Sequence, residues 1–126
     1  MARGDDIWQR DGGHCVWCST ESWPRDRTLE HLLPRSRGGR SGEHNLLPAC
    51  RPCNKARGSR SAAAHARERA EAGRTVDVGL LLAGLDRLAA HGTPAERDYG
   101  EHQGRTVRGW QASERALAEH LARFAA

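Results

Sequence analysis

The chain has 126 residues, of which 37% are hydrophobic and 5% aromatic, and its formal net charge at pH 7 is +4. Its longest apolar run, residues 79–85, is far too short to span a bilayer, and its first residues lack the apolar stretch of a secretory signal peptide. These features exclude a membrane-spanning protein and favour a reducing compartment, so we expect a cytoplasmic protein with no membrane partner.

Four cysteines form two Cys-x-x-Cys pairs, Cys15 with Cys18 and Cys50 with Cys53, and the chain has no other cysteine. Each pair turns two thiolates toward one point, and two pairs supply the four ligands of a tetrahedral Zn²⁺ site. Two disulfides are an alternative, but such a pair seldom bridges with itself, and a redox motif needs only one pair. We therefore expect a structural zinc ion, without which the N-terminal half has too little to bury to fold.

Several short motifs follow one another between and just after the cysteine pairs. Glu30 and His31 are adjacent on a predicted strand, a basic Gly-rich segment spans residues 35–40, Asn45 precedes a hydrophobic stretch, and Asn54 directly follows the last cysteine. Strand alternation puts adjacent side chains on opposite faces, but at a strand end both can reach a site at its edge. Each residue alone is more often structural, a turn residue or a solvated charge. Their joint occurrence indicates a catalytic site.

Residues 29–39, 45–48 and 50–58 resemble the HNH endonucleases, in particular the four-cysteine branch seen in phage, restriction and homing nucleases. Residues 8–18 also look like the usual segment before and through the first cysteine pair. The resemblance covers about residues 5–58. It implies an α+β fold: a small ββα-metal core, with two short strands and a helix around one divalent ion, a four-cysteine structural zinc site, and here an α-helical C-terminal extension.

The resemblance further implies a metal-dependent endonuclease that hydrolyses DNA phosphodiester bonds, by nicking or double-strand cleavage, and leaves a 5′ phosphate and a 3′ hydroxyl. His31 is then the general base that activates water, and Asn45 holds the neighbouring loop so that the base stays in place. Glu30 and Asn54 are the expected ligands of the catalytic ion, and this carboxylate and amide oxygen suit Mg²⁺ or Mn²⁺.

One residue departs from the family pattern, because Glu30 stands where the family usually has Asp. The carboxylate of Glu is one methylene farther from the backbone, so it reaches a different point. The alternative interpretation is therefore a non-catalytic, zinc-stapled module that binds DNA or a partner protein and carries a decayed HNH site.

Positive charge gathers around the expected active site, since residues 35–60 contain seven basic side chains and one acidic one. Such a patch attracts the phosphate backbone, although an Arg-rich chain with a solvated face is the alternative. No aromatic residues occur at the regular spacing of an RNA-stacking motif, so double-stranded DNA is the expected partner. The expected nucleic-acid contacts are Arg35, Arg37, Arg40, Lys55 and Arg57.

Residues 59–126 are rich in Ala, Leu, Arg and Glu, and they predict a helical extension that follows the nuclease core of residues 1–58. Helices are predicted over residues 59–72 and 78–89, and a capping box at residues 93–96 starts another. This extension either packs on the core or forms a surface for a homodimer or a protein partner.

After the capping box, three glycines predict a loop with a short extended piece at residues 105–108: Gly100, Gly104 and Gly109. A last helix is predicted to begin near Ser113, with three apolar residues on one face: Leu117, Leu121 and Phe124. The histidines outside the motif, His65 among them, are expected at the surface.

Overall fold

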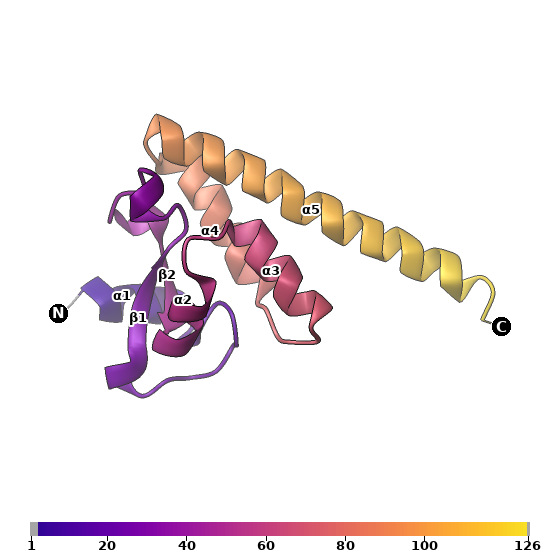
Figure 1. Cartoon of the computed structure of the whole chain (residues 1–126), viewed down its shortest axis with the longest axis horizontal. Coiled ribbons are helices and arrows are strands. Elements are labelled where there is room, and N and C mark those ends of the chain that lie inside the picture. Colours follow the sequence, from indigo (N-terminus) through magenta and orange to yellow (C-terminus); the bar gives the residue numbers. More distant parts are fainter. Residues whose placement is uncertain (1–2, 126) are drawn as a thin grey trace.

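The computed structural model describes residues 3–125, in which a two-stranded antiparallel sheet is combined with five α-helices (Figure 1). Strand β1 (Arg27–His31) pairs with β2 (Leu46–Cys50), and His31 lies opposite Leu46 in the register. Helix α2 (Arg51–Arg57) begins directly after β2 and packs on β1. This β1–β2–α2 unit confirms the predicted ββα core and the α+β fold class.

Helix α1 (Arg3–Arg10) precedes the core and was not among the predicted elements. Its first turn carries Asp5 and Asp6 and its last turn carries Arg10, an arrangement that suits the helix dipole. The buried Trp8 fixes the helix on the sheet, because its indole N–H donates to the Thr28 carbonyl at 2.9 Å. Eight residues give too few turns for hydrophobic periodicity to predict such a helix.

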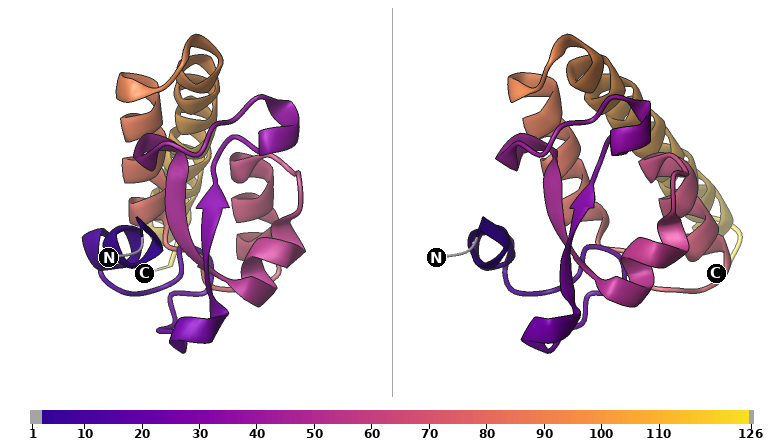
Figure 2. Two further views of the ribbon diagram at one scale, coloured as in Figure 1. Left: turned by 90° about the vertical axis from the view of Figure 1, so that its left-hand side faces the viewer. Right: turned by 60° about the vertical axis from the view of Figure 1, so that its left-hand side comes forward.

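Helices α3 (Ala62–Glu71), α4 (Val78–His91) and α5 (Pro94–Ala122) form the C-terminal part. Figure 2 shows α4 beside β2, with α2 and α3 on the side of β1. The first two helices lie within three residues of their predicted bounds, and the capping box is present between Thr93 and Glu96. None of the helices within residues 3–125 is long and apolar enough to cross a membrane.

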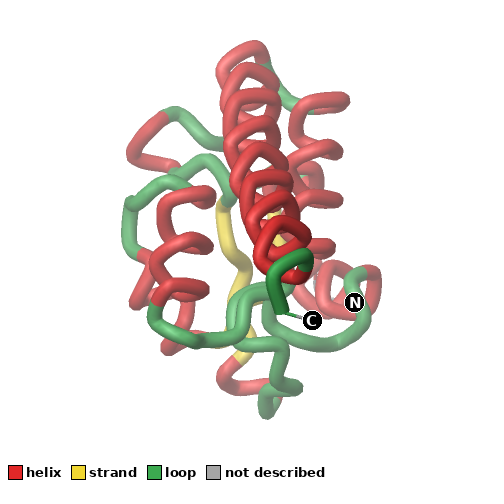
Figure 3. Tube along the Cα trace, turned by 90° about the vertical axis from the view of Figure 1, so that its right-hand side faces the viewer, coloured by secondary structure: helices red, strands yellow, loops and turns green. Residues whose placement is uncertain are grey.

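The predicted loop around the three glycines is wrong, because α5 runs through all of them as one helix of 29 residues (Figure 3). Gly100 lies where α5 crosses α4: a Cβ there would come within 2.7 Å of the Leu85 carbonyl oxygen and 2.8 Å of the Ala89 nitrogen. On α4, Gly84 faces Leu47 of β2 with similarly little space. The close packing that glycine permits offsets its low helix propensity, so Gly84 and Gly100 mark helix contacts rather than helix ends.

One hydrophobic core joins the segments on both sides of residue 58. It contains Trp17 from the first zinc-binding pair, Leu47 from β2, Leu85 from α4 and Val107 from α5. Asp77, which caps α4, also bonds to the first half, since its backbone N–H donates to the Val16 carbonyl at 2.9 Å. The helices therefore supply apolar burial that the short sheet lacks.

Gly100→Ala should lower the free energy of unfolding by about 1–3 kcal/mol, because the new methyl group overpacks the contact between α4 and α5. Gly109→Ala is the matched control on the same helix, where a Cβ meets nothing within 4 Å, and it should raise stability by about 0.5–1 kcal/mol. Urea unfolding of the zinc-loaded proteins, followed by circular dichroism, measures both changes. A stabilising Gly100→Ala would contradict the close crossing.

Candidate functional site

The four cysteines converge on one point, with all four sulfur atoms within 4.8 Å of one another. The Sγ atoms of Cys18 and Cys50 are 3.8 Å apart, and a tetrahedron with Zn–S bonds of about 2.3 Å has an edge of about 3.8 Å. All four thiols are free, so the disulfide alternative does not apply. The arrangement fits the structural zinc ion that the sequence predicted.

The surroundings of the thiols differ in their effect on ionisation. Burial raises the pKa of Cys15 to about 11, and burial also raises the pKa of Cys53. At Cys18, burial acts in the same direction, but hydrogen bonding to Thr20 outweighs it and holds the pKa at about 7. A thiol must lose its proton to bind zinc, so Cys18 becomes available near neutral pH more readily than Cys15 or Cys53.

The predicted catalytic residues meet at a second place, the C-terminal end of β1. A hollow of about 210 Å³ lies between this strand end and α2. It is lined by Glu30, His31, Pro34, Arg35, Asn54 and Gly58. The structure therefore brings together the three residues expected to supply the base and the metal ligands.

His31 is half-buried at the edge of this hollow, and its Nε2 lies 2.9 Å from the Ser41 hydroxyl oxygen. Burial lowers the pKa of His31, and the nearby positive charges of Arg35 and Arg57 lower it further. The imidazole is therefore neutral at neutral pH and able to accept a proton.

Asn45 is fully buried beneath the loop that follows β1. Its Oδ1 accepts from the Leu33 N–H at 2.9 Å, and its Nδ2 donates to the carbonyls of Leu33 at 3.1 Å and Arg40 at 2.8 Å. Gly39 closes the same loop so tightly that a Cβ there would overlap the Leu33 carbonyl. Asn45 and Gly39 thus fix the backbone immediately after His31.

Glu30 is buried with only 2% of its surface exposed, and both of its carboxylate oxygens have partners. Arg57 Nη1 lies 2.5 Å from Oε1, and the Trp17 indole N–H donates to Oε2 at 2.9 Å. Burial raises the pKa of Glu30, while Arg57 and Trp17 act against this by stabilising the carboxylate. Nothing in the sequence spacing pointed to Trp17 as a partner of this residue.

Arg57 requires a correction, because the sequence placed it on the DNA-facing surface and the structure buries it to 1% exposure. Besides Glu30, its guanidinium donates to the carbonyls of His31 at 2.7 Å and Leu32 at 2.6 Å, and to the Tyr99 hydroxyl at 3.2 Å. It therefore ties α2 and α5 to the end of β1, leaving it no access to DNA. The other expected contacts are exposed: Arg35, Arg37, Arg40 and Lys55.

His65 is also placed differently from the expectation, since it is buried at 4% exposure rather than on the surface. Its ring packs edge-on against Trp17, with the ring centroids 4.7 Å apart. Burial, reinforced by nearby arginines, lowers the pKa of His65 to about 4. The neutral ring serves as an aromatic packing group behind the Trp17–Glu30 contact.

Two residues with oxygen atoms of the kind that divalent ions prefer line the hollow, Glu30 and Asn54. Asn54 Nδ2 donates to Thr28 Oγ1 at 3.1 Å and to the Leu29 carbonyl at 3.3 Å, which leaves Oδ1 as its ligand atom. A carboxylate has about four lone-pair sites, so Glu30 retains acceptor capacity beyond its two hydrogen bonds. One carboxylate and one amide oxygen on a shared wall are oxygen ligands that Mg²⁺ and Mn²⁺ prefer.

Comparisons with known proteins agree with this geometry. Residues 15–69 match the family model of the HNH endonucleases. The resemblance seen in the sequence is thereby confirmed. No curated protein matches the chain.

Among solved structures, the chain is similar to the Type II-C Cas9 enzyme from Actinomyces naeslundii, with a TM-score of 0.51 and 21% sequence identity. The match covers 85% of this chain and 11% of that one. The likeness concerns the fold, and its extent means that it continues from the ββα core into the C-terminal helices.

The purified protein should contain one zinc ion per chain. Cys50→Ala should contain no zinc and should no longer show a cooperative unfolding transition, because the ion holds the two cysteine pairs together. Elemental analysis and thermal unfolding measure the two effects. His14→Ala is the matched control: His14 adjoins Cys15 but bonds to Asp77 at 2.7 Å, so its zinc content should not change. Full zinc content in Cys50→Ala would contradict the site.

In an NMR titration of the zinc-loaded protein without added Mg²⁺, His31 should titrate with a midpoint below 6.5. Arg35→Ala should move this midpoint upward, because it removes one of the charges that disfavour the imidazolium. Arg37→Ala removes an exposed arginine from the same turn and should leave it nearly unchanged. A midpoint above 6.5 in the wild type would show that burial and the two arginines do not act on His31 as the structure indicates.

Proposed function

We propose that this protein is a metal-dependent endonuclease that hydrolyses DNA phosphodiester bonds. The observation that carries the proposal is the shared hollow, whose wall contains Glu30, His31 and Asn54 at the junction of β1 and α2. The family match over residues 15–69 supports a nuclease-type domain and a nucleic-acid substrate.

In the proposed reaction, His31 is the general base. Its neutral imidazole takes a proton from water, the water oxygen forms a bond to phosphorus, the bond from phosphorus to the 3′ oxygen breaks, and that oxygen takes up a proton from solvent. The products are a 5′ phosphate and a 3′ hydroxyl. Asn45 acts as a positioning residue, since its hydrogen bonds to Leu33 and Arg40 fix the loop beside the base.

Asn54 and Glu30 are the proposed ligands of a Mg²⁺ or Mn²⁺ ion. When bound, the ion supplies positive charge beside the scissile phosphate and the departing oxygen. Arg57 acts through Glu30: it holds one carboxylate oxygen and the carbonyls that follow β1, and so limits where the carboxylate can lie. The longer side chain of Glu thus has a fixed partner behind it.

Double-stranded DNA is the proposed substrate, and the exposed basic side chains near the hollow are its proposed contacts: Arg35, Arg37, Arg40 and Lys55. Arg35 belongs to the wall of the hollow itself. Their guanidinium and ammonium groups match phosphate oxygens, and binding through them weakens as salt concentration rises.

The second candidate is a non-catalytic, zinc-stapled module that binds DNA or a partner protein. One observation favours it: both Glu30 oxygens are occupied by interior hydrogen bonds, from Arg57 and Trp17. A carboxylate held in this way serves as a structural group whether or not an ion binds.

Supercoiled plasmid incubated with wild-type protein should become relaxed or linear only when Mg²⁺ or Mn²⁺ is added. His31→Ala should slow this conversion by about 10²- to 10⁴-fold, because the base is lost. Asn54→Ala should need a higher Mg²⁺ concentration for the same rate. His91→Ala is the matched control, since it removes an exposed histidine at the end of α4, and it should cut like the wild type.

Normal turnover by His31→Ala would refute the assignment of the base. If the wild type cuts with neither metal, yet retains zinc and binds DNA, the binding module becomes the better description. Glu30→Asp adds a separate test of the ligand. If Glu30→Asp cuts and the wild type does not, the native site is weakened; if both proteins cut, Glu is an effective ligand.

A further inference from the structure

Trp23 is exposed to 76%, whereas Trp8 and Trp17 are almost completely buried. It lies in the segment between the first cysteine pair and β1, and the short helix η1 (Pro24–Asp26) follows it. No hydrogen bond involves its indole N–H within residues 3–125. A single exposed aromatic residue is common on protein surfaces, so its surroundings decide what it means.

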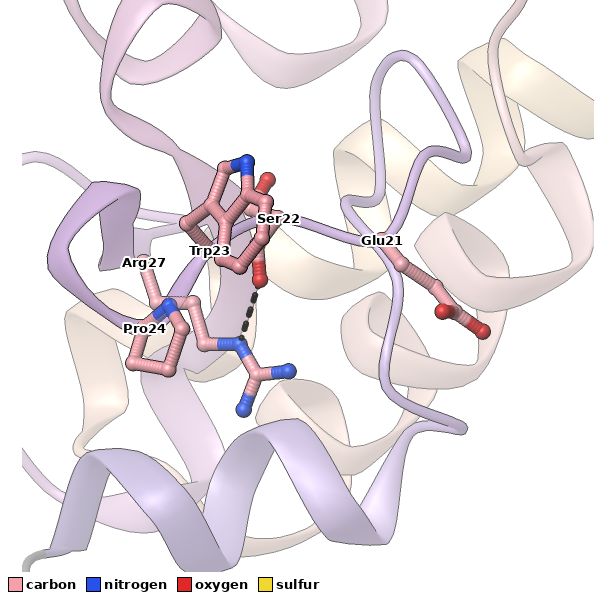
Figure 4. Close-up of a pocket in the computed structure, with 5 residues that line it drawn as sticks. All are labelled: Glu21, Ser22, Trp23, Pro24 and Arg27. Carbon is pink, nitrogen blue, oxygen red and sulfur yellow. Dashed lines mark hydrogen bonds between the residues drawn. The ribbon is translucent and has the colours of Figure 1, made fainter.

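Trp23 stands over a hollow of about 370 Å³ (Figure 4). The indole rises above Pro24 and Arg27, and the Arg27 Nε donates to the Ser22 carbonyl at 3.1 Å. Glu21 points away from both Trp23 and Arg27. The floor of the hollow is therefore held in place, while the indole presents its ring to solvent.

Arg51 connects this segment to the active-site helix, because its Nη2 donates to the Arg25 carbonyl at 3.1 Å. On α2, residues three and four positions apart share a face. Arg51 therefore shares a face with Asn54 and Lys55. Asn54 in turn bonds to Thr28 and Leu29 in the middle of β1. A continuous surface thus runs from the Trp23 hollow, along α2, to the proposed metal ligands.

Charge along this surface suits a polyanion. Arg25 and Arg51 are exposed and Arg27 is half-buried. The segment also holds two carboxylates: Glu21 lines the hollow with its carboxylate pointing away from Trp23 and Arg27, and Asp26 is half-buried. An exposed indole bordered by arginines is the combination that binds nucleic-acid strands, because bases stack on the ring and phosphates pair with the guanidinium groups.

Strand β1 sets the distance to the catalytic residue. It extends from Arg27 to His31, which at about 3.3 Å per residue is roughly 13 Å. The end of the hollow at Arg27 therefore lies roughly 13 Å along β1 from His31.

We propose that Trp23 stacks on an unpaired base of the DNA held in the active site, so that the preferred substrate is a duplex with a single-stranded flank. This inference rests on the proposed function and specifies its substrate. Bases inside a duplex are covered on both faces by their neighbours, so the indole can stack only on a base that has left the duplex. Stacking of this kind tolerates any base sequence.

The test compares binding of two labelled DNAs by fluorescence anisotropy, one fully paired and one with a single-stranded flank beside the duplex, using zinc-loaded protein without Mg²⁺. The wild type should bind the flanked DNA about 5- to 100-fold more tightly, the range that stacking of one base provides. Trp23→Ala should lose this preference and Trp23→Phe should retain most of it. Phe124→Ala is the matched control, because Phe124 is also 76% exposed, and it should behave as the wild type.

Removing single bases along the flank, while keeping the backbone, locates the contact. One abasic position in the single-stranded flank should weaken wild-type binding as much as Trp23→Ala does, and it should not weaken the Trp23→Ala protein further. If Trp23→Ala weakened binding of both DNAs equally, Trp23 would be a general contact and the inference would be overturned. A preference for the flanked DNA that Trp23→Ala leaves unchanged would also overturn it. If Trp23→Ala fails to keep its zinc, Trp23→Phe and the abasic series still decide the question.

The plasmid assay separates this inference from the proposed function. If the wild type cuts plasmid and the preference for flanked DNA is the same in Trp23→Ala, the nuclease assignment is retained and the stacking contact is rejected. Absence of cleavage together with a flank preference that depends on Trp23 would reject the nuclease and retain the contact.

Discussion

The buried ion pair between Glu30 and Arg57 connects every part of the molecule that forms the site. Glu30 belongs to β1 and Arg57 to α2, while Trp17 from the zinc-binding segment and Tyr99 from α5 complete the network. Removing one partner of such a pair leaves an unpaired buried charge, which is strongly destabilising. The geometry of the hollow around His31 thus depends on a contact that is itself inaccessible to substrate.

Two other sources of stability support this pair from opposite sides. The four cysteines bring the segments before β1 and after β2 to one point, so that Trp17 reaches Glu30. Helix α4 packs on β2, α5 packs on α4 and α3, and both helices extend the core. A two-stranded sheet is at best marginally stable in water by itself, so the metal site and the helices together stabilise the strand end that carries His31.

The surface around the site divides its basic residues into two groups with different roles. Arg57 points inward and holds the backbone that follows β1, whereas Arg35 and Lys55 face outward beside the hollow. Sequence clustering could not separate the two groups, because both lie in the same basic stretch. For Arg57 and Lys55, which both belong to α2, the separation follows from helix geometry: one face of α2 meets β1 and the opposite face meets solvent.

From the sequence alone, the spacing of the cysteines predicted the zinc site, and the resemblance to the HNH endonucleases predicted the ββα core and made His31, Asn45 and Asn54 candidates. The sequence also determined the start of α5 through the Thr93 capping box, a local interaction. It could not determine that α5 continues through Gly100, since that depends on the space left by Leu85 and Ala89 of α4. Likewise, only the tertiary structure decided that Arg57 is internal and that Trp23 is exposed at the far end of β1. Spacing along the chain predicts local motifs and helix caps. The burial of a side chain and its pairing partner depend on distant segments that meet only in the folded chain.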